Sequence, residues 1–278
     1  MSTSLGASFD PPPPPAPPGG HGLLEGRVVL VTAAAGTGIG SATARRCLEE
    51  GASVVVSDAH ERRLAETAAQ LADELRSGSG GTDASERIHA IPCNVTSETQ
   101  VQALYDGALD RFGRVDVAVH NAGLGGTVGL VEMTDEQWST VLDVTLTGTF
   151  RCTRAALARM MPQHHGVIVN NASVLGWRAQ PGQAHYAAAK AGVMALTRCA
   201  AAEAAPFGVR VNAVSPSLAE HPFLNRSIPD EDLAVLRGRE LFGRGAETWE
   251  VANVIVFLAS DYSSYMSGEV VSVSSQHP

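Results

Sequence analysis

The stretch RVVLVTAAAGTGIG, residues 27–40, decides the fold of this chain. A β-branched apolar run is followed by glycines at positions 36, 38 and 40, and an amphipathic segment then extends from Ile39 to Glu50. This order predicts a strand, a tight turn and a helix whose first N–H groups face the turn. At the end of a parallel strand, such a turn is the usual site for a dinucleotide pyrophosphate. The glycine spacing departs from G-x-G-x-x-G, so the prediction depends on the strand and helix around it.

The same alternation of strand and helix continues through the rest of the chain. Six further apolar runs are predicted strands: ASVVVSD (52–58), RIHAIPC (87–93), VDVAVHNAG (115–123), GVIVNNAS (166–173), VRVNAVS (209–215) and EVVSVS (269–274). Helical patterns lie between them at residues 61–75, 98–113, 135–161 and 183–205. Apolar strands between helices predict an α/β fold, a single Rossmann-like, doubly wound parallel sheet with helices on both faces.

Length and composition favour one large folded unit. The chain has 278 residues, of which 44% are hydrophobic and 18% are charged, which is enough for one extensive core. We expect this domain to span residues 23–278 and a disordered Pro- and Gly-rich tail to span residues 1–22. Residues 217–245 have the least regular pattern of the second half, which predicts a lid over a substrate pocket.

Charge and cysteine content narrow the class of protein. A formal net charge of −9 argues against general binding to nucleic acid or to an anionic membrane. No apolar run reaches the length of a membrane span and the first residues lack a signal-peptide pattern, so we expect a cytoplasmic protein. The cysteines have no C-x-x-C pair and no ligand-like spacing, so we expect no metal site and free thiols at Cys47, Cys93, Cys152 and Cys199.

Asp58 closes the second predicted strand, about 20 residues beyond the glycine turn. A carboxylate there accepts hydrogen bonds from the adenosine ribose hydroxyls and repels a 2′-phosphate, so NAD is favoured over NADP. Asp58 can also cap the helix that follows, and the two roles are compatible. Arg62 and Arg63 lie one turn downstream, so use of NADP stays open.

Tyr186 and Lys190 are four residues apart on a helical segment, so their side chains project from one face. Lys190 is the only lysine among 20 basic residues. A tyrosine needs its pKa lowered by roughly 3 units, about 4 kcal/mol, to act as a base near neutral pH. An ammonium group about 4 to 5 Å away supplies roughly that much. Ser173 lies thirteen residues before Tyr186, just after a predicted strand.

The order and spacing of Ser173, Tyr186 and Lys190, with the glycine turn and Asn121-Ala122-Gly123, resemble the short-chain dehydrogenase/reductase family over about residues 24–273. The resemblance implies that Tyr186 exchanges a proton with the substrate oxygen, Ser173 orients that oxygen, and Lys190 binds the nicotinamide ribose and lowers the Tyr186 pKa. It implies an NAD site formed by Gly36, Gly38, Ile39, Gly40, Asp58, Asn94, Val95, Asn121, Ala122, Gly123, Tyr186, Lys190, Pro216 and Ala219. It also implies a homotetramer that associates through helices 135–161 and 183–205.

Several positions depart from the family pattern. Thr145 stands where the family commonly has a fourth catalytic residue, an asparagine that helps to hold a proton-relay water. A backbone carbonyl at this position can still bind that water. Ser217 and His221 replace a frequent glycine and threonine beside the nicotinamide carboxamide.

The substrate pocket is expected to include Trp177, Arg178 and His221. The strings AAAGTGIGSATARR, NNASVLGWRAQ and SDYSSYMSGEVVSVSSQ resemble a branch of the family that acts on a ring hydroxyl of a steroid-derived indane coenzyme A thioester. Arginines in the predicted lid fit thioester phosphates or an ordinary solvated surface, and they are Arg226, Arg237, Arg239 and Arg244. A 3-oxoacyl thioester reductase and a non-catalytic NAD-binding sensor are the alternatives.

Overall fold

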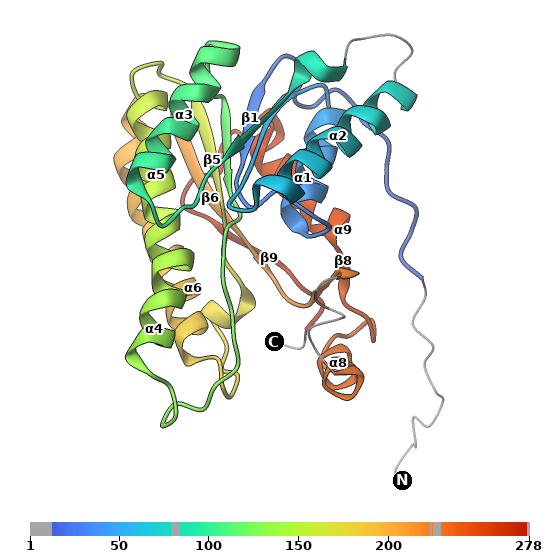
Figure 1. The fold of residues 1–278 in the computed structure, drawn as a ribbon, viewed down its shortest axis with the longest axis vertical. Helices are drawn as coiled ribbons and strands as arrows, with labels where there is room; N and C mark the ends of the chain where they lie inside the picture. Colours follow the sequence, from blue (N-terminus) through green and yellow to red (C-terminus); the bar gives the residue numbers. More distant parts are fainter. Residues whose placement is uncertain (1–12, 79–83, 223, 225–228, 277–278) are drawn as a thin grey trace.

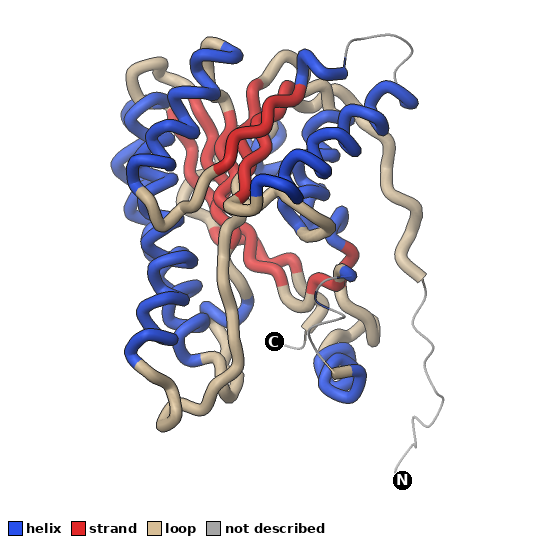
Figure 2. The backbone as a smooth tube through the Cα atoms, in the orientation of Figure 1, coloured by secondary structure: helices blue, strands red, loops and turns tan. Residues whose placement is uncertain are grey.

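Seven parallel strands form the main sheet of the computed structural model, which describes residues 13–78, 84–222, 224 and 229–276 (Figure 2). The strands are β1 (Val28–Val31), β2 (Ser53–Asp58), β3 (Ile88–Pro92), β4 (Val117–His120), β5 (Gly166–Asn171), β6 (Val209–Pro216) and β9 (Val270–Val273). Their order is β3-β2-β1-β4-β5-β6-β9, so the winding reverses between β1 and β4. The predicted doubly wound parallel sheet is confirmed, and its reversal point is where such folds bind ligands.

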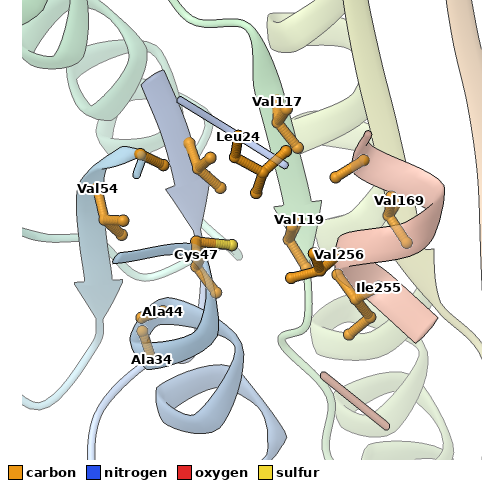
Figure 3. Close-up of a cluster of buried hydrophobic side chains, with 14 of the residues drawn as sticks. Leu24, Ala34, Ala44, Cys47, Val54, Val117, Val119, Val169, Ile255 and Val256 are labelled. Carbon is orange, nitrogen blue, oxygen red and sulfur yellow. The ribbon is translucent and has the colours of Figure 1, made fainter. Parts of the chain in front are cut away.

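Helices cover both faces of this sheet (Figure 1). One face carries α1 (Ile39–Glu49), α2 (Glu61–Gly78) and α9 (Thr248–Ala259), and the other carries α3 (Glu98–Phe112), α5 (Gly148–Met160) and α6 (Ala184–Ala204). Consecutive side chains of a strand point to opposite faces, so both faces need apolar residues. In β1, Val29 packs in the cluster that contains Cys47 and Ile255, both labelled in Figure 3, whereas Leu30 packs on the opposite side with Tyr105.

The prediction of one long helix over residues 135–161 is wrong in one respect. The structure has α4 (Asp135–Leu142), a π-helical turn (Asp143–Thr147) and then α5. The Thr145 hydroxyl donates to the Leu124 carbonyl and accepts from the Leu124 N–H, at 3.1 and 3.0 Å. These hydrogen bonds join the π-helical turn to a distant segment, and a helical sequence pattern does not reveal such a turn.

The C-terminal part of the chain adds small elements beyond the end of the main sheet. They are the paired strands β7 (Ala219–Glu220) and β8 (Ala246–Glu247) and the helix α8 (Asp230–Arg237). Short 3-10 turns complete the described elements at Ala84–Arg87, Val174–Gly176, Ala205–Phe207 and Asp261–Ser263. Segment 217–245, the predicted lid, therefore contains regular structure next to the C-terminal residues of β9 (Figure 1).

Part of the expected N-terminal tail is attached to α1. Residues 13–22 contain no helix or strand, while residues 1–12 lie outside the described part of the chain. Arg46 donates to the Pro18 carbonyl, and the buried Glu50 carboxylate accepts from the His21 and Leu23 N–H groups. None of the described helices has the length and apolar character needed to cross a membrane.

Gly40 provides a test of how the first turn packs on the sheet. A Cβ atom at this position would lie 2.2 Å from the Ala33 carbonyl oxygen and 2.7 Å from Asn121 Nδ2. We expect Gly40→Ala to lower the free energy of unfolding by about 1–3 kcal/mol, because backbone must move to admit the methyl group. Gly38→Ala is the matched control, since nothing lies within 4 Å of its Cβ position. Equal urea midpoints for the Gly40 variant and the wild type would contradict this packing.

Candidate active site

The N-terminus of α1 has the features of an anion site. Its N-cap residue, Gly38, has no side chain to accept from the first N–H groups, and no acidic residue lies in the first turn. Gly36 adopts a positive φ of 86°, which glycine allows without strain, and Ala33 adopts a φ of 50°. The open space at Gly36 and Gly38 and the free helix N–H groups fit a dinucleotide pyrophosphate.

Asp58 lies beside this turn, as its predicted role requires. Its carboxylate accepts from the Ala35 N–H at 3.3 Å and from the His60 N–H at 2.9 Å. The Asp58 carboxylate therefore accepts hydrogen bonds from the backbone of the glycine turn and from the segment that follows β2. Asn94 uses its side-chain oxygen within its own turn, accepting from the Thr96 N–H and hydroxyl, and Val95 is buried against Gly148.

Asn121 connects the ends of three neighbouring strands. Its backbone N–H donates to the Thr32 hydroxyl at the end of β1, as does the N–H of Ala122. Its side-chain amide donates to the Ala33 carbonyl and accepts from Asn171 Nδ2 at the end of β5. Gly123 lies two residues after Asn121, and a Cβ there would be 3.4 Å from Lys190 Nζ. This predicted element thus joins the glycine turn to the residues around Lys190.

Ser173 and Tyr186 line one pocket of about 260 Å³ at the carboxyl end of β5. Four other residues predicted from the sequence line the same pocket, namely Ile39, Pro216, Ala219 and His221. Parallel strands end at a common edge, so residues far apart in the chain meet there. The structure therefore brings the predicted reacting residues together with part of the predicted cofactor set.

Lys190 is buried behind Tyr186 on α6 and donates from Nζ to the carbonyl oxygen of Asn171. Its Nζ lies 5.5 Å from the centre of the Tyr186 ring. Burial lowers the pKa of Lys190 to about 7. Burial also raises the pKa of Tyr186, and a hydrogen bond with Ser173 only partly opposes that shift.

One electrostatic expectation is therefore wrong for the chain's own groups. The sequence predicted that the Lys190 ammonium lowers the pKa of Tyr186, but among the chain's own groups desolvation of the phenol has the larger effect and raises it. The same desolvation weakens the charge on Lys190 itself. Tyr186 is accordingly held as a neutral phenol.

The predicted substrate residues lie in different settings. Trp177 is 51% exposed and is not among the residues that line the pocket. Arg178 donates to Gln276 Oε1 at 2.6 Å, and Gln276 does line the pocket. His221 also lines it, and burial lowers the pKa of His221.

Two lid arginines are already paired with carboxylates. Arg237 binds Glu220 and Arg244 binds Glu250, whereas Arg226 lies outside the described residues. Arg239 makes a long contact of 3.5 Å with Gln180. These pairings show that Arg237 and Arg244 already have carboxylate partners within the chain.

Three residues at this end of the molecule escaped the sequence analysis. Glu240 is 5% exposed and accepts from the side chains of Ser217, Ser275 and Gln276, so it connects the lid to the C-terminal segment. Gln276 also lines the pocket of Ser173 and Tyr186. Asn171 is hydrogen-bonded to both Lys190 and Asn121. A polar side chain that ends a buried strand two residues before Ser173 was the signal available for Asn171.

Comparison with known proteins gives consistent matches over nearly the whole chain. A family model described as enoyl-(acyl carrier protein) reductase matches residues 33–275. The chain is 63% identical over 260 residues to the (5R,7aS)-5-hydroxy-7a-methyl-1-oxo-2,3,5,6,7,7a-hexahydro-1H-indene-carboxyl-CoA reductase of Mycobacterium tuberculosis, covering 93% of this chain and 96% of the relative. It is 38% identical to a 3-oxoacyl-(acyl-carrier-protein) reductase of Thermotoga maritima, covering 90% of this chain and 97% of the relative.

A solved structure agrees with these sequence matches. A short-chain dehydrogenase from Mycobacterium smegmatis is 61% identical and superposes with a TM-score of 0.82, covering 95% of this chain and 98% of the other. Together, the sheet order, the family model and these relatives show that the chain belongs to the short-chain dehydrogenase/reductase family of nicotinamide-dependent oxidoreductases.

Proposed function

We propose that this protein is an NAD-dependent oxidoreductase that interconverts a ring hydroxyl and a ketone on a steroid-derived coenzyme A thioester. The observation that carries the proposal is the single pocket lined by Ser173 and Tyr186, with Lys190 buried directly behind Tyr186. The M. tuberculosis relative, a reductase of an indene-carboxyl-CoA compound at 63% identity, supports the substrate class.

Proton transfer at this site would involve different roles for Tyr186, Ser173 and Lys190. Nicotinamide, when bound, accepts or donates the hydride. A proton moves between the substrate oxygen and Tyr186 Oη. Ser173 Oγ already accepts from the Leu175 N–H at 3.3 Å, so its own hydrogen is available for Tyr186 or the substrate oxygen. Lys190 is fixed by the Asn171 carbonyl, which keeps its ammonium group beside the phenol.

Reduction and oxidation require different protonation states of Tyr186. A neutral phenol is ready to donate its proton to a ketone oxygen, which is the requirement for reduction. Oxidation of an alcohol requires the phenolate, and the positive charge of Lys190 favours that form. Burial of Tyr186 thus suits proton donation in reduction, and the charge of Lys190 suits the phenolate that oxidation requires.

Asp58 supports NAD over NADP as the cofactor. Its carboxylate faces the Ala35 N–H of the glycine turn, and Arg62 is turned to Glu66 at 3.9 Å. A 2′-phosphate placed at this carboxylate would meet a like charge.

Three further assignments follow from the proposed chemistry. We expect Trp177, Arg178 and His221 to contact substrate, since Arg178 and His221 lie at the pocket or next to it. A homotetramer is proposed from family membership and from the exposed aromatic residues Trp138 on α4 and Phe150 on α5, and sedimentation analysis at the mass of four chains tests it. The four free cysteines and the use of NAD and coenzyme A thioesters support a cytoplasmic location, which fractionation of cells would test.

Cofactor preference is the first prediction of this assignment. We expect kcat/KM to be at least about tenfold higher with NADH than with NADPH, because of the charge repulsion at Asp58. Asp58→Ser should reduce this preference by weakening NADH and relieving NADPH. Steady-state rates with both cofactors measure it, and a wild-type preference for NADPH would contradict the assignment.

Substrate class is the second prediction. We expect the highest kcat/KM on indane-type coenzyme A thioesters, lower values on linear 3-oxoacyl thioesters and the lowest on free hydroxysteroids. The linear thioesters matter because relatives at 38% identity are 3-oxoacyl reductases. Turnover of the linear compounds alone would favour the 3-oxoacyl reductase alternative. Tight NADH binding with no turnover of any compound would favour a sensor.

Removal of the phenolic hydroxyl tests the proposed chemistry directly. Tyr186→Phe should lower kcat by about 10²- to 10⁴-fold, the range expected for loss of a general acid or base. NADH affinity, measured by fluorescence titration, should change little because the ring remains. Tyr262→Phe is the matched control, since Tyr262 is 75% exposed and lies outside the pocket lining. Undiminished activity of the Tyr186 variant would refute the mechanism.

A further inference from the structure

Asn171, the last residue of β5, has a buried side-chain oxygen with no hydrogen-bond partner in the part of the chain that the structure describes. The residue is 9% exposed and lines the pocket of Ser173 and Tyr186. Leaving such an oxygen unpaired is costly, and the great majority of buried polar atoms in native proteins are paired. A partner from outside the chain is therefore expected at this position.

The identity of the unpaired atom follows from the neighbouring hydrogen bonds. Asn121 Nδ2 donates to the Ala33 carbonyl at 3.1 Å, which fixes the orientation of the Asn121 amide. Its oxygen must then face Asn171 and accept from Asn171 Nδ2 at 2.8 Å. The remaining atom of Asn171 is consequently its Oδ1, which is an acceptor and requires a donor.

The position of this oxygen limits which groups can donate a hydrogen bond to it. The backbone carbonyl of the same residue holds Lys190, and its amide nitrogen leads through Asn121 to the glycine turn. Asn171 thus lies between the residue beside the reacting phenol and the turn that fits a pyrophosphate. The nicotinamide half of a bound dinucleotide must pass this point, and its hydrogen-bond donors are ribose hydroxyls and a carboxamide N–H group.

Thr145 does not compete for this role. Its side chain is fully buried, and its hydroxyl is already committed to both backbone groups of Leu124. Its carbonyl oxygen accepts from the Thr149 hydroxyl at 2.7 Å. Asn171 is the residue whose carbonyl meets Lys190 and whose side chain still has an acceptor to offer.

We propose that Asn171 is a cofactor-binding residue whose Oδ1 accepts a hydrogen bond from a hydroxyl or amide donor on the nicotinamide half of the dinucleotide. Its backbone carbonyl and Nδ2 meanwhile position Lys190 and Asn121. This inference rests on the proposed use of a nicotinamide cofactor and adds a contact that determines how its reacting half is held.

Nucleotide binding tests the proposal without any substrate. NADH affinity is measured by fluorescence titration and ADP affinity by calorimetry, since ADP lacks the nicotinamide and its ribose. Asn171→Leu should weaken NADH on the order of tenfold, about the effect of one hydrogen bond to a buried acceptor, and leave ADP unchanged. Asn171→Asp keeps an acceptor oxygen but loses the donor to Asn121, so it should bind NADH more tightly than the leucine variant.

A matched control and two contrary results complete the experiment. Asn253 on α9 has the same kind of unpaired buried oxygen outside the pocket lining, and Asn253→Leu should leave NADH affinity unchanged. Unchanged NADH affinity in Asn171→Leu would overturn the proposal. Equal losses for NADH and ADP, with the aspartate variant no better than leucine, would also overturn it by showing a purely structural role.

The experiment also separates this inference from the proposed function. Failure of the wild-type protein to bind NADH would refute the proposed function itself, whereas wild-type binding with an unaffected Asn171→Leu variant refutes only the role of Asn171. If the leucine variant does not fold, Asn171→Ala removes the same oxygen with a smaller side chain and replaces the leucine variant in the comparison.

Discussion

The hydrogen bonds that join the carboxyl ends of β1, β4 and β5 are the constraint on which the site depends. Thr32 and Ala33 at the end of β1 bind Asn121 after β4, Asn121 binds Asn171 at the end of β5, and Asn171 binds Lys190 on α6. Neighbouring parallel strands end at one edge, so this chain of contacts is short despite the long sequence separations. It fixes the glycine turn and the buried ammonium relative to each other before any ligand enters.

Burial is the second determinant of the chemistry. Desolvation raises the pKa of Tyr186 and lowers that of Lys190 to about 7, so each group is pushed toward its neutral form. Lys190 nevertheless remains 5.5 Å from the phenol ring, where its positive form stabilises a phenolate. Burial thus favours the neutral phenol of Tyr186, while a positive Lys190 beside it favours the phenolate.

The sequence predicted the features that repeat and those that depend on spacing. Seven apolar runs predicted all seven strands of the main sheet. The spacing of Ser173 and Tyr186 predicted that they lie together, and both line one pocket. The sequence did not predict the π-helical turn at 143–147, where Thr145 is hydrogen-bonded to the distant Leu124. The pairing of Arg237 with Glu220, the buried Glu240 and the orientation of the Asn171 amide also depend on tertiary neighbours. Such contacts between distant segments leave no periodic pattern.

We propose that the buried Lys190, held by the Asn171 carbonyl, supports proton transfer by Tyr186. The most direct measurement is kcat of Lys190→Arg, which keeps a positive charge but replaces the compact ammonium with a wide guanidinium. Nζ is held by the Asn171 carbonyl, and a Cβ atom at Gly123 would lie 3.4 Å from it, so a wide guanidinium does not fit the same contacts. We expect a loss of at least about 100-fold in kcat, within the range for general acid–base catalysis. A folded Lys190→Arg protein that keeps kcat within about threefold of the wild type would contradict it.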